Sequence, residues 1–192
     1  MAARAIEELA AHHVGGHLKV APEHVDETVL DLMKKPRNVN FEGFARAFRK
    51  ASVDAGKPKQ FLVPYYIASH PGSDLNAMID LALFLKRNGY KPDQVQDFIP
   101  APFDVATAMY YTGIDPFTKQ PVYVAQHLRD RKLQRALLQF FKKENYFEVR
   151  QALEQAGRQD LADLESAEIA VLSAYLPQRL SPEEVQKAVD AI

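Results

Sequence analysis

Residues 60–72, QFLVPYYIASHPG, decide the fold of this chain. A nearly continuous apolar run, rich in β-branched and aromatic residues and closed by turn formers, is typical of a strand buried on both faces. Pro64 interrupts the run, and because proline cannot donate to the ladder it indicates a kink, a bulge or a sheet edge. Helical spacing follows from Leu75 to Arg87, so this strand is expected to lead into a β/α unit.

Two further strands flank this central one in the chain. Residues 18–21 form a short apolar stretch closed by Pro22-Glu23-His24, and residues 94–99 form another closed by Pro100-Ala101-Pro102. Helical spacing lies between the strands, and such strand–helix repeats imply a parallel sheet with right-handed connections. The predicted fold class is α/β: a partial, half β/α barrel with parallel strands, followed by an α-helical C-terminal extension.

The helix boundaries follow from capping residues. Asp26, Asn40 and either Ser73 or Asp74 are expected N-caps, and Gly89 is expected to end the helix that precedes the third strand. Four helices are predicted in the extension, over residues 128–141, 147–156 and 160–176 and from Ser181 onward.

Composition limits the classes of function. The net charge of -1 gives no bulk attraction to nucleic acid or acidic membranes. No apolar run approaches the roughly 20 residues that a membrane span needs, and the N-terminus has no signal-peptide pattern, so a cytoplasmic location is expected. The chain has 0 cysteines, which excludes disulfides and thiolate ligands for zinc or an iron–sulfur cluster from its own side chains.

The polar tips of the three strands are the candidate site. Parallel strands bring their carboxyl ends to one edge of a sheet, where ligands bind in α/β folds. Glu23, His24 and His70 would then be ligands of a metal-dependent hydrolase or an acid/base pair. The alternative for each is a polar loop residue that caps a helix or bonds to the backbone. The basic helix from residue 128 is interpreted mainly as a solvated face.

Several long motifs, in order along the chain, carry a resemblance to one family. They are HHVGGHLKVAPEH at 12–24, SHPG at 69–72, QVQDF at 94–98 and ATAMYYTG at 106–113, with Lys35-Pro36, Pro64-Tyr65 and Asp115-Pro116. Over about residues 5–160 the chain resembles the YgiQ family of radical S-adenosylmethionine (SAM) proteins.

This resemblance implies a partial β/α barrel that holds SAM and a [4Fe-4S] cluster. The cysteines of the family's CxxxCxxC loop have no counterpart here, so the chain is expected to be inactive alone and to need the missing N-terminal half of the barrel as a partner. Residues 1–125 would be the C-terminal half of the barrel and residues 126–160 a helical family extension. Strand ends that line the SAM pocket would supply Glu23, Ser69, His70, Gln96 and Pro100.

The tail carries a second resemblance. The words AGRQDL at 156–161, EIAVL at 168–172 and YLP at 175–177 resemble part of the GatB/YqeY helical domain, which is associated with tRNA-dependent amidotransferases. Residues 161–192 would be a fragment of that domain. The alternative function is therefore an interaction module whose tail meets tRNA or a partner protein. Half a barrel also leaves unpaired sheet edges, so self-association is expected.

Overall fold

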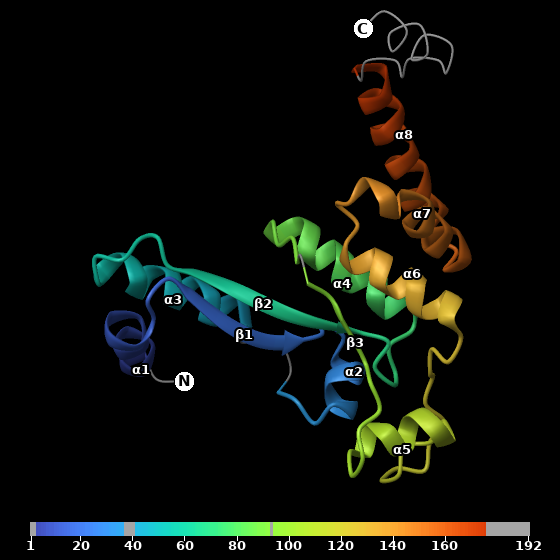
Figure 1. The fold of residues 1–192 in the computed structure, drawn as a ribbon, viewed down its shortest axis with the longest axis horizontal. Helices are drawn as coiled ribbons and strands as arrows, with labels where there is room; N and C mark the ends of the chain where they lie inside the picture. Colours follow the sequence, from blue (N-terminus) through green and yellow to red (C-terminus); the bar gives the residue numbers. More distant parts are fainter. Residues whose placement is uncertain (1–2, 37–40, 93, 176–192) are drawn as a thin grey trace, which may run out of the picture.

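The computed structural model describes residues 3–36, 41–92 and 94–175, with side chains in the last helix described up to residue 167. Figure 1 shows the elements in their arrangement. In chain order they are α1 (Ala3–Glu8), the π-helical turn η1 (Leu9–His13), β1 (His17–Glu23), α2 (Glu27–Leu32), α3 (Phe41–Asp54), β2 (Phe61–Ala68), α4 (Leu75–Asn88), β3 (Gln96–Asp97), α5 (Val105–Thr112), α6 (Leu128–Leu138), the 3-10 turn η3 (Lys143–Asn145), α7 (Tyr146–Gln155) and α8 (Gln159–Tyr175).

The sheet confirms the predicted fold class. Its described strands run in the order β1-β2-β3, and both pairings are parallel. The β1–β2 ladder is irregular beside Pro64: Val20 pairs with Pro64, but the next registered pair joins Glu23 to Tyr66, so β1 carries an extra residue. Pro64 therefore does sit at a bulged part of the ladder. The third strand is shorter than the predicted 94–99, because only Gln96 and Asp97 pair with β2.

Helix capping follows the sequence closely. The side chain of Asp26 accepts a hydrogen bond from the Val29 N–H, and that of Asp74 accepts one from the Ala77 N–H. Gly89 ends α4 in the left-handed conformation, with φ of 68°. The predicted cap at residue 40 and the predicted helix from residue 181 lie outside the described residues.

One core joins the sheet to the C-terminal helices. Tyr66 and Ala68 at the end of β2 pack with Met78 and Leu85 of α4. Side chains of α6, α7 and the start of α8 complete this cluster: Leu133, Ala136, Leu137, Leu138, Val149, Ala152, Leu153 and Ala162. The carboxyl half of β2 therefore shares one core with four helices that come later in the chain, α4, α6, α7 and α8.

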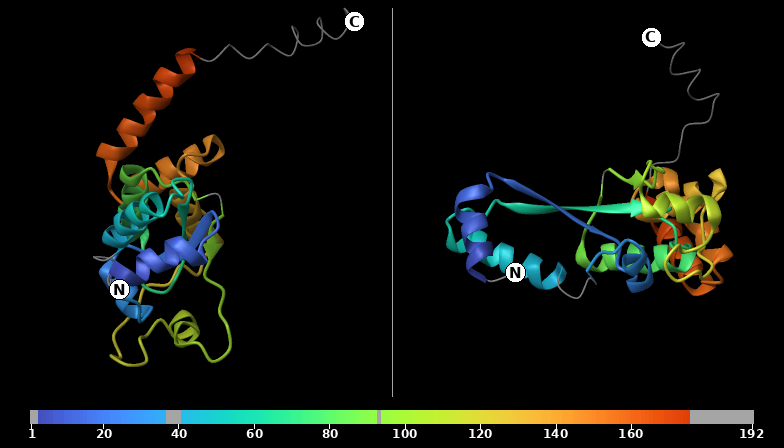
Figure 2. Two further views of the ribbon diagram at one scale, coloured as in Figure 1. Left: turned by 90° about the vertical axis from the view of Figure 1, so that its left-hand side faces the viewer. Right: turned by 90° about the horizontal axis from the view of Figure 1, so that it is seen from below.

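A second, smaller core covers one face of the amino half of the sheet. Phe48 and Ala51 of α3 pack with Ile6 and Ala10, while Leu18 and Leu62 of the strands pack against them. Figure 2 shows α1 and α3 on this one side of β1 and β2. Among the described residues, no helix covers the opposite face there, and the side chain of Phe61 on it is 51% exposed. The prediction that the central strand is buried on both faces is thus wrong for its first half.

Candidate functional site

A pocket of about 430 Å³ lies at the carboxyl ends of the three strands. Three of the predicted site residues, Glu23, His70 and Gln96, come together in its wall. Glu23 ends β1, His70 comes shortly after the end of β2, and Gln96 belongs to β3, so the parallel register of the sheet is what brings them to one place. The other lining residues are Leu32, Met33, Lys34, Lys35, Ile67, Asp97, Phe98, Ile99, Asp104, Val105 and Ala106.

His70 lines this pocket as a neutral imidazole. Its Nδ1–H donates to the carbonyl oxygen of Pro71 at 2.8 Å, so Nε2 carries the lone pair. The ring meets that of Phe98 edge-on, with centroids 5.2 Å apart. Burial lowers the pKa of His70, while the Pro71 carbonyl and the carboxylates of Asp104 and Glu23 act in the opposite direction. The ring is therefore an acceptor at neutral pH.

Glu23 closes the first strand in a strained conformation. Its φ of 67° is left-handed, which non-glycine residues rarely adopt. Lys35 fixes it there, because the ammonium group lies 3.1 Å from Oε1 of Glu23 and donates to the carbonyl oxygen of Ala21 at 3.1 Å. This lysine links the end of α2 to the end of β1 and supplies a cation to the pocket wall.

Backbone strain collects around this pocket. Four of the five described non-glycine residues with positive φ line it or directly precede a lining residue. They are Glu23, Lys34, Ser69 and Phe103, with φ values of 67°, 56°, 64° and 66°. Such strain persists where the surrounding structure imposes it, and it concentrates at ligand sites.

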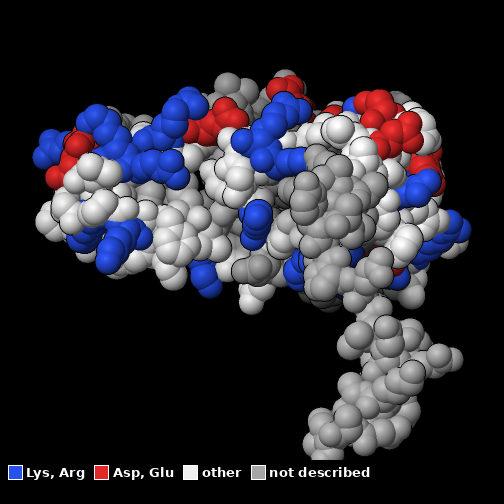
Figure 3. All heavy atoms as spheres, turned by 90° about the horizontal axis from the view of Figure 1, so that it is seen from above, with Lys and Arg blue, Asp and Glu red and all other residues white. Residues whose placement is uncertain are grey.

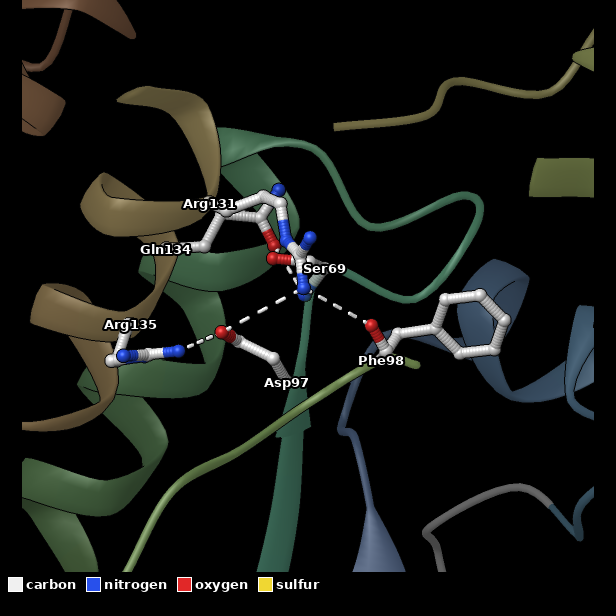
Figure 4. A network of polar contacts seen from close by, with 6 residues as sticks. All are labelled: Ser69, Asp97, Phe98, Arg131, Gln134 and Arg135. Carbon is white, nitrogen blue, oxygen red and sulfur yellow. Dashed lines mark hydrogen bonds and ion pairs between the residues drawn. The ribbon is translucent and has the colours of Figure 1, made fainter. Parts of the chain in front are cut away.

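Helix α6 holds the strand ends in place (Figure 4). The buried amide of Gln134 accepts a hydrogen bond from the Ser69 N–H at 2.8 Å and donates one to the Ser73 carbonyl oxygen at 2.6 Å. Arg131 donates to the carbonyl oxygen of Phe98 at 3.2 Å, and Arg135 forms an ion pair with Asp97. These contacts fix the turn after β2 and the end of β3 relative to each other.

Two buried polar atoms at these strand ends have no hydrogen-bond partner among the described residues. They are the hydroxyl oxygen of Ser69 and Oδ1 of Asp97. The other carboxylate oxygen of Asp97 is the one that Arg131 and Arg135 approach. A buried oxygen without a partner costs free energy, and Asp97 lines the pocket, so its Oδ1 favours a ligand that carries hydrogen-bond donors.

The structure does not bring every predicted residue to the pocket. Pro100 is absent from its lining, and Ser69 lies just behind the lining residue His70. His24 is buried with both ring nitrogens bonded, since the Asp26 N–H donates to Nδ1 at 3.0 Å and Nε2 lies 3.2 Å from the hydroxyl of Ser73. Burial lowers the pKa of His24 to about 4. His24 therefore joins β1 to the turn before α4 instead of serving as a ligand.

Sequence reasoning missed the charged residues of the wall. Lys34, Lys35, Asp97 and Asp104 line the pocket but were not among the predicted site residues. The motif QVQDF contains Asp97, and the Lys35-Pro36 word contains Lys35, so a signal was present for two of them. Within the part of the chain that the structure describes, no three His, Cys, Asp or Glu side chains form a group that could hold a metal ion. None of the described helices is long and apolar enough to cross a membrane.

Comparisons with known proteins agree on one family. Residues 93–171 match a family described as a domain of unknown function, DUF3362. A UPF0313 protein of Clostridium botulinum (strain Loch Maree) is 49% identical over 155 residues, which are 81% of this chain and 24% of that protein. UPF0313 proteins of Geobacter sulfurreducens and Clostridium perfringens (strain 13) are each 48% identical over 81% of this chain and over 26% and 23% of their own lengths. No solved structure gives a significant match.

The chain spans about a quarter of the length of the curated relatives that it matches. The region shared with them includes at least part of the sheet as well as of the helices, because 81% of the chain is aligned. The identity of nearly one residue in two over that length leaves no doubt about common descent, and the chain belongs to the UPF0313 (YgiQ) family.

Proposed function

We propose that the pocket at the strand ends is one wall of a SAM-binding site in a radical SAM barrel whose cluster-bearing wall lies outside this chain. The observation that carries the proposal is the convergence of Glu23, His70 and Gln96 in one pocket, from three consecutive parallel strands. The choice of SAM as the ligand rests on the resemblance of this family, UPF0313, to radical SAM proteins.

The lining of the pocket suits a zwitterionic ligand with an apolar part. Carboxylates of Glu23 and Asp104 complement an ammonium or sulfonium group, and the positive charge of Lys34 and Lys35 in the wall complements a carboxylate. Ile67 and Phe98 offer apolar surface of the kind that a purine ring contacts. The orphaned Oδ1 of Asp97 is an acceptor for an amine or hydroxyl donor. SAM carries each of these groups.

The residues of this chain would bind and orient the cofactor. Lys35 holds the Glu23 carboxylate, and Gln134 holds the backbone turn that presents His70. The lone pair on Nε2 of His70 would accept a proton donor of the ligand. On this proposal, SAM and a [4Fe-4S] cluster would supply the radical chemistry in the intact protein. This chain has 0 cysteines, so it would need the remainder of the family protein for that chemistry.

The test is a titration of the isotope-labelled full chain with SAM, followed by NMR. Shifts should gather at the backbone amides of Glu23, His70 and Gln96, with saturation in the millimolar range expected of a half-site, about 1–5 mM. His70→Ala and Asp97→Asn should each weaken this binding about tenfold, as expected for losing one hydrogen bond to a charged group. His13→Ala, on the exposed end of η1, is the matched control and should bind as the wild type does.

Two results would count against the proposal. One is a titration that moves no amide of the pocket. The other is a set of shifts that gather elsewhere and persist in His70→Ala. No observation on the described residues, which include 161–175 of the predicted tail, favours the tRNA-binding alternative, and the rest of that tail lies outside them.

A further inference from the structure

The open face of the amino half of the sheet is a surface of the described residues that the proposed function leaves unused. It consists of His17 and Lys19 on β1, Phe61, Val63 and Tyr65 on β2, and Lys91 before β3, and we call it the open face. These residues line a hollow of about 510 Å³. A second hollow of about 550 Å³, with Arg135 and Lys142 in its lining, adjoins the first because both are lined by Tyr65 and Gln94.

The charge on this surface has one sign. Among the described residues, no carboxylate lines either hollow, whereas Lys19, Lys91, Arg135 and Lys142 all do. The pocket at the strand ends differs, since both carboxylates and lysines line it. Figure 3 shows the molecule from above, with the open face along the lower edge, where the coloured side chains are mainly those of Lys and Arg.

Three of these cations have no carboxylate partner among the described residues. They are Lys19, Lys91 and Lys142, whereas Arg135 is paired with Asp97. The ammonium group of Lys19 lies 5.7 Å from the ring centroid of Tyr65, and the ring of His17 lies 4.0 Å from that of Phe61. The open face therefore combines aromatic side chains with lysines that have no carboxylate partner among the described residues.

The backbone beside this face also lacks a partner. β1 is the outer strand of the described sheet, so its free edge presents donors and acceptors over its 7 residues, about 23 Å at 3.3 Å per residue. Lys35 occupies the Ala21 carbonyl oxygen, and Pro22 has no N–H to offer. The edge is therefore open mainly at the amino half of β1, beside the cationic surface.

We propose that the open face docks an acidic polypeptide segment, one that belongs to the part of the family protein outside this chain. Lysines that have no carboxylate partner among the described residues favour an acidic ligand, and half-exposed aromatic side chains favour an apolar covering. About three quarters of each curated relative lies outside the matched region, which is ample to supply such a segment. The inference rests on the proposed function only for the identity of this partner.

The experiment titrates the labelled full chain with a blocked hexaglutamate peptide and follows the amide signals by NMR. Shifts should gather at residues 17–19, 61–65 and 91, and the affinity should fall about tenfold between 50 and 500 mM salt because the contacts are ionic. Lys19→Glu and Lys91→Glu should each reduce the affinity at least about fivefold. Lys50→Glu, which makes the same charge change on exposed α3, should leave it unchanged.

A co-purification sharpens the identity of the partner. The tagged chain is co-expressed with the part of the Geobacter sulfurreducens protein that lies outside the matched region. At low salt the tagged chain should retain this part, and the double variant Lys19→Glu, Lys91→Glu should not. Three results would overturn the proposal: hexaglutamate that moves no signal of the open face, a hexauridylate that binds there more tightly than hexaglutamate, or a dimer of the chain that Lys19→Glu dissociates. If hexaglutamate binds and SAM does not, the SAM-pocket proposal fails and the open-face proposal stands. If SAM binds and hexaglutamate does not, the open-face proposal fails and the SAM-pocket proposal stands.

Discussion

The two halves of this sheet are built differently. At the carboxyl ends of the strands, Gln134 and Arg131 of α6 tie the turn after β2 and the end of β3 together, and the ends surround a pocket. In the amino half, helices cover one face of β1 and β2 while Phe61 on the other face is half exposed. At the carboxyl ends, the side chains of α6 thus hold the strand ends beside a pocket, whereas in the amino half one face of β1 and β2 has no covering helix among the described residues.

The first test of this contrast removes the contacts that Gln134 of α6 makes at the carboxyl ends of the strands. Gln134→Leu removes the acceptor for the Ser69 N–H and the donor for the Ser73 carbonyl, and leaves two backbone groups buried without partners. We expect a loss of about 3 kcal/mol in the free energy of unfolding, measured by urea denaturation. Gln155→Leu, at an exposed position of α7, should change it by less than about 0.5 kcal/mol. Equal effects of the two substitutions would contradict this account.

The second test uses pH. Burial lowers the pKa of His24 to about 4, so the unfolded chain takes up a proton near pH 6.5 that the folded chain refuses. The stability that the neutral ring contributes is present above pH 6.5 and is lost as the pH falls toward 4. Between pH 7 and 5 the loss should be about 2 kcal/mol in urea unfolding.

The variant His24→Asn should flatten this dependence, because its amide oxygen can still accept the Asp26 N–H and does not titrate. His13→Asn, at an exposed position, should keep the slope of the wild type. An unchanged slope in His24→Asn would assign the pH dependence to other groups, of which His70 is the first candidate because burial lowers its pKa as well.

A third test concerns the turn that carries His70. Gly72 has φ of 92°, and a Cβ there would lie 2.3 Å from Cδ1 of Leu32 in the pocket wall. Gly72→Ala should cost about 1.5 kcal/mol and weaken SAM binding, since Leu32 must move. In Gly43→Ala, within α3, nothing lies within 4 Å of the new Cβ, so this variant should be stabilised by up to about 1 kcal/mol. Circular dichroism melting curves of the two variants should therefore shift in opposite directions.

The smallest effect is expected on the open face. Phe61→Thr removes a ring that is only half buried, so the free energy of unfolding should fall by less than about 1 kcal/mol in urea titrations of the chain alone. Phe48→Thr, in the covered core of α3, should cost about 3 kcal/mol or more. If Phe61→Thr proved as damaging as Phe48→Thr, the amino half of the sheet would be covered in solution and the contrast would fail.

Local sequence signals were enough to predict most of the elements. Asp26 and Asp74 cap the starts of their helices and Gly89 caps the end of α4, as predicted, because capping depends on neighbours a few residues away. The parallel order followed from the strand–helix repeat. The exposure of Phe61 was not predictable in this way, because an apolar strand has the same sequence whether or not the chain itself supplies the covering surface.

The candidate site was predicted in part, for a similar reason. The ends of parallel strands identified Glu23 and His70, and the family resemblance added Gln96; these three do meet in the pocket. The residues that α2 and α5 bring to it, Lys34 and Asp104 among them, depend on how loops fold back over the strand ends, and no local pattern encodes that path. His24 has the residue type of a ligand, but its two neighbours Asp26 and Ser73 engage it fully.

At the four left-handed residues around the pocket, the backbone conformation favours glycine, but the chain has other side chains there. Glycine at position 23, 34, 69 or 103 would relax the backbone by about 1 kcal/mol each, yet this chain keeps an acid, a base, a hydroxyl and a fully exposed phenyl ring there. Glycine substitutions made for stability at these positions would therefore remove side chains at or beside the pocket, and with them any contact that these side chains make with a ligand.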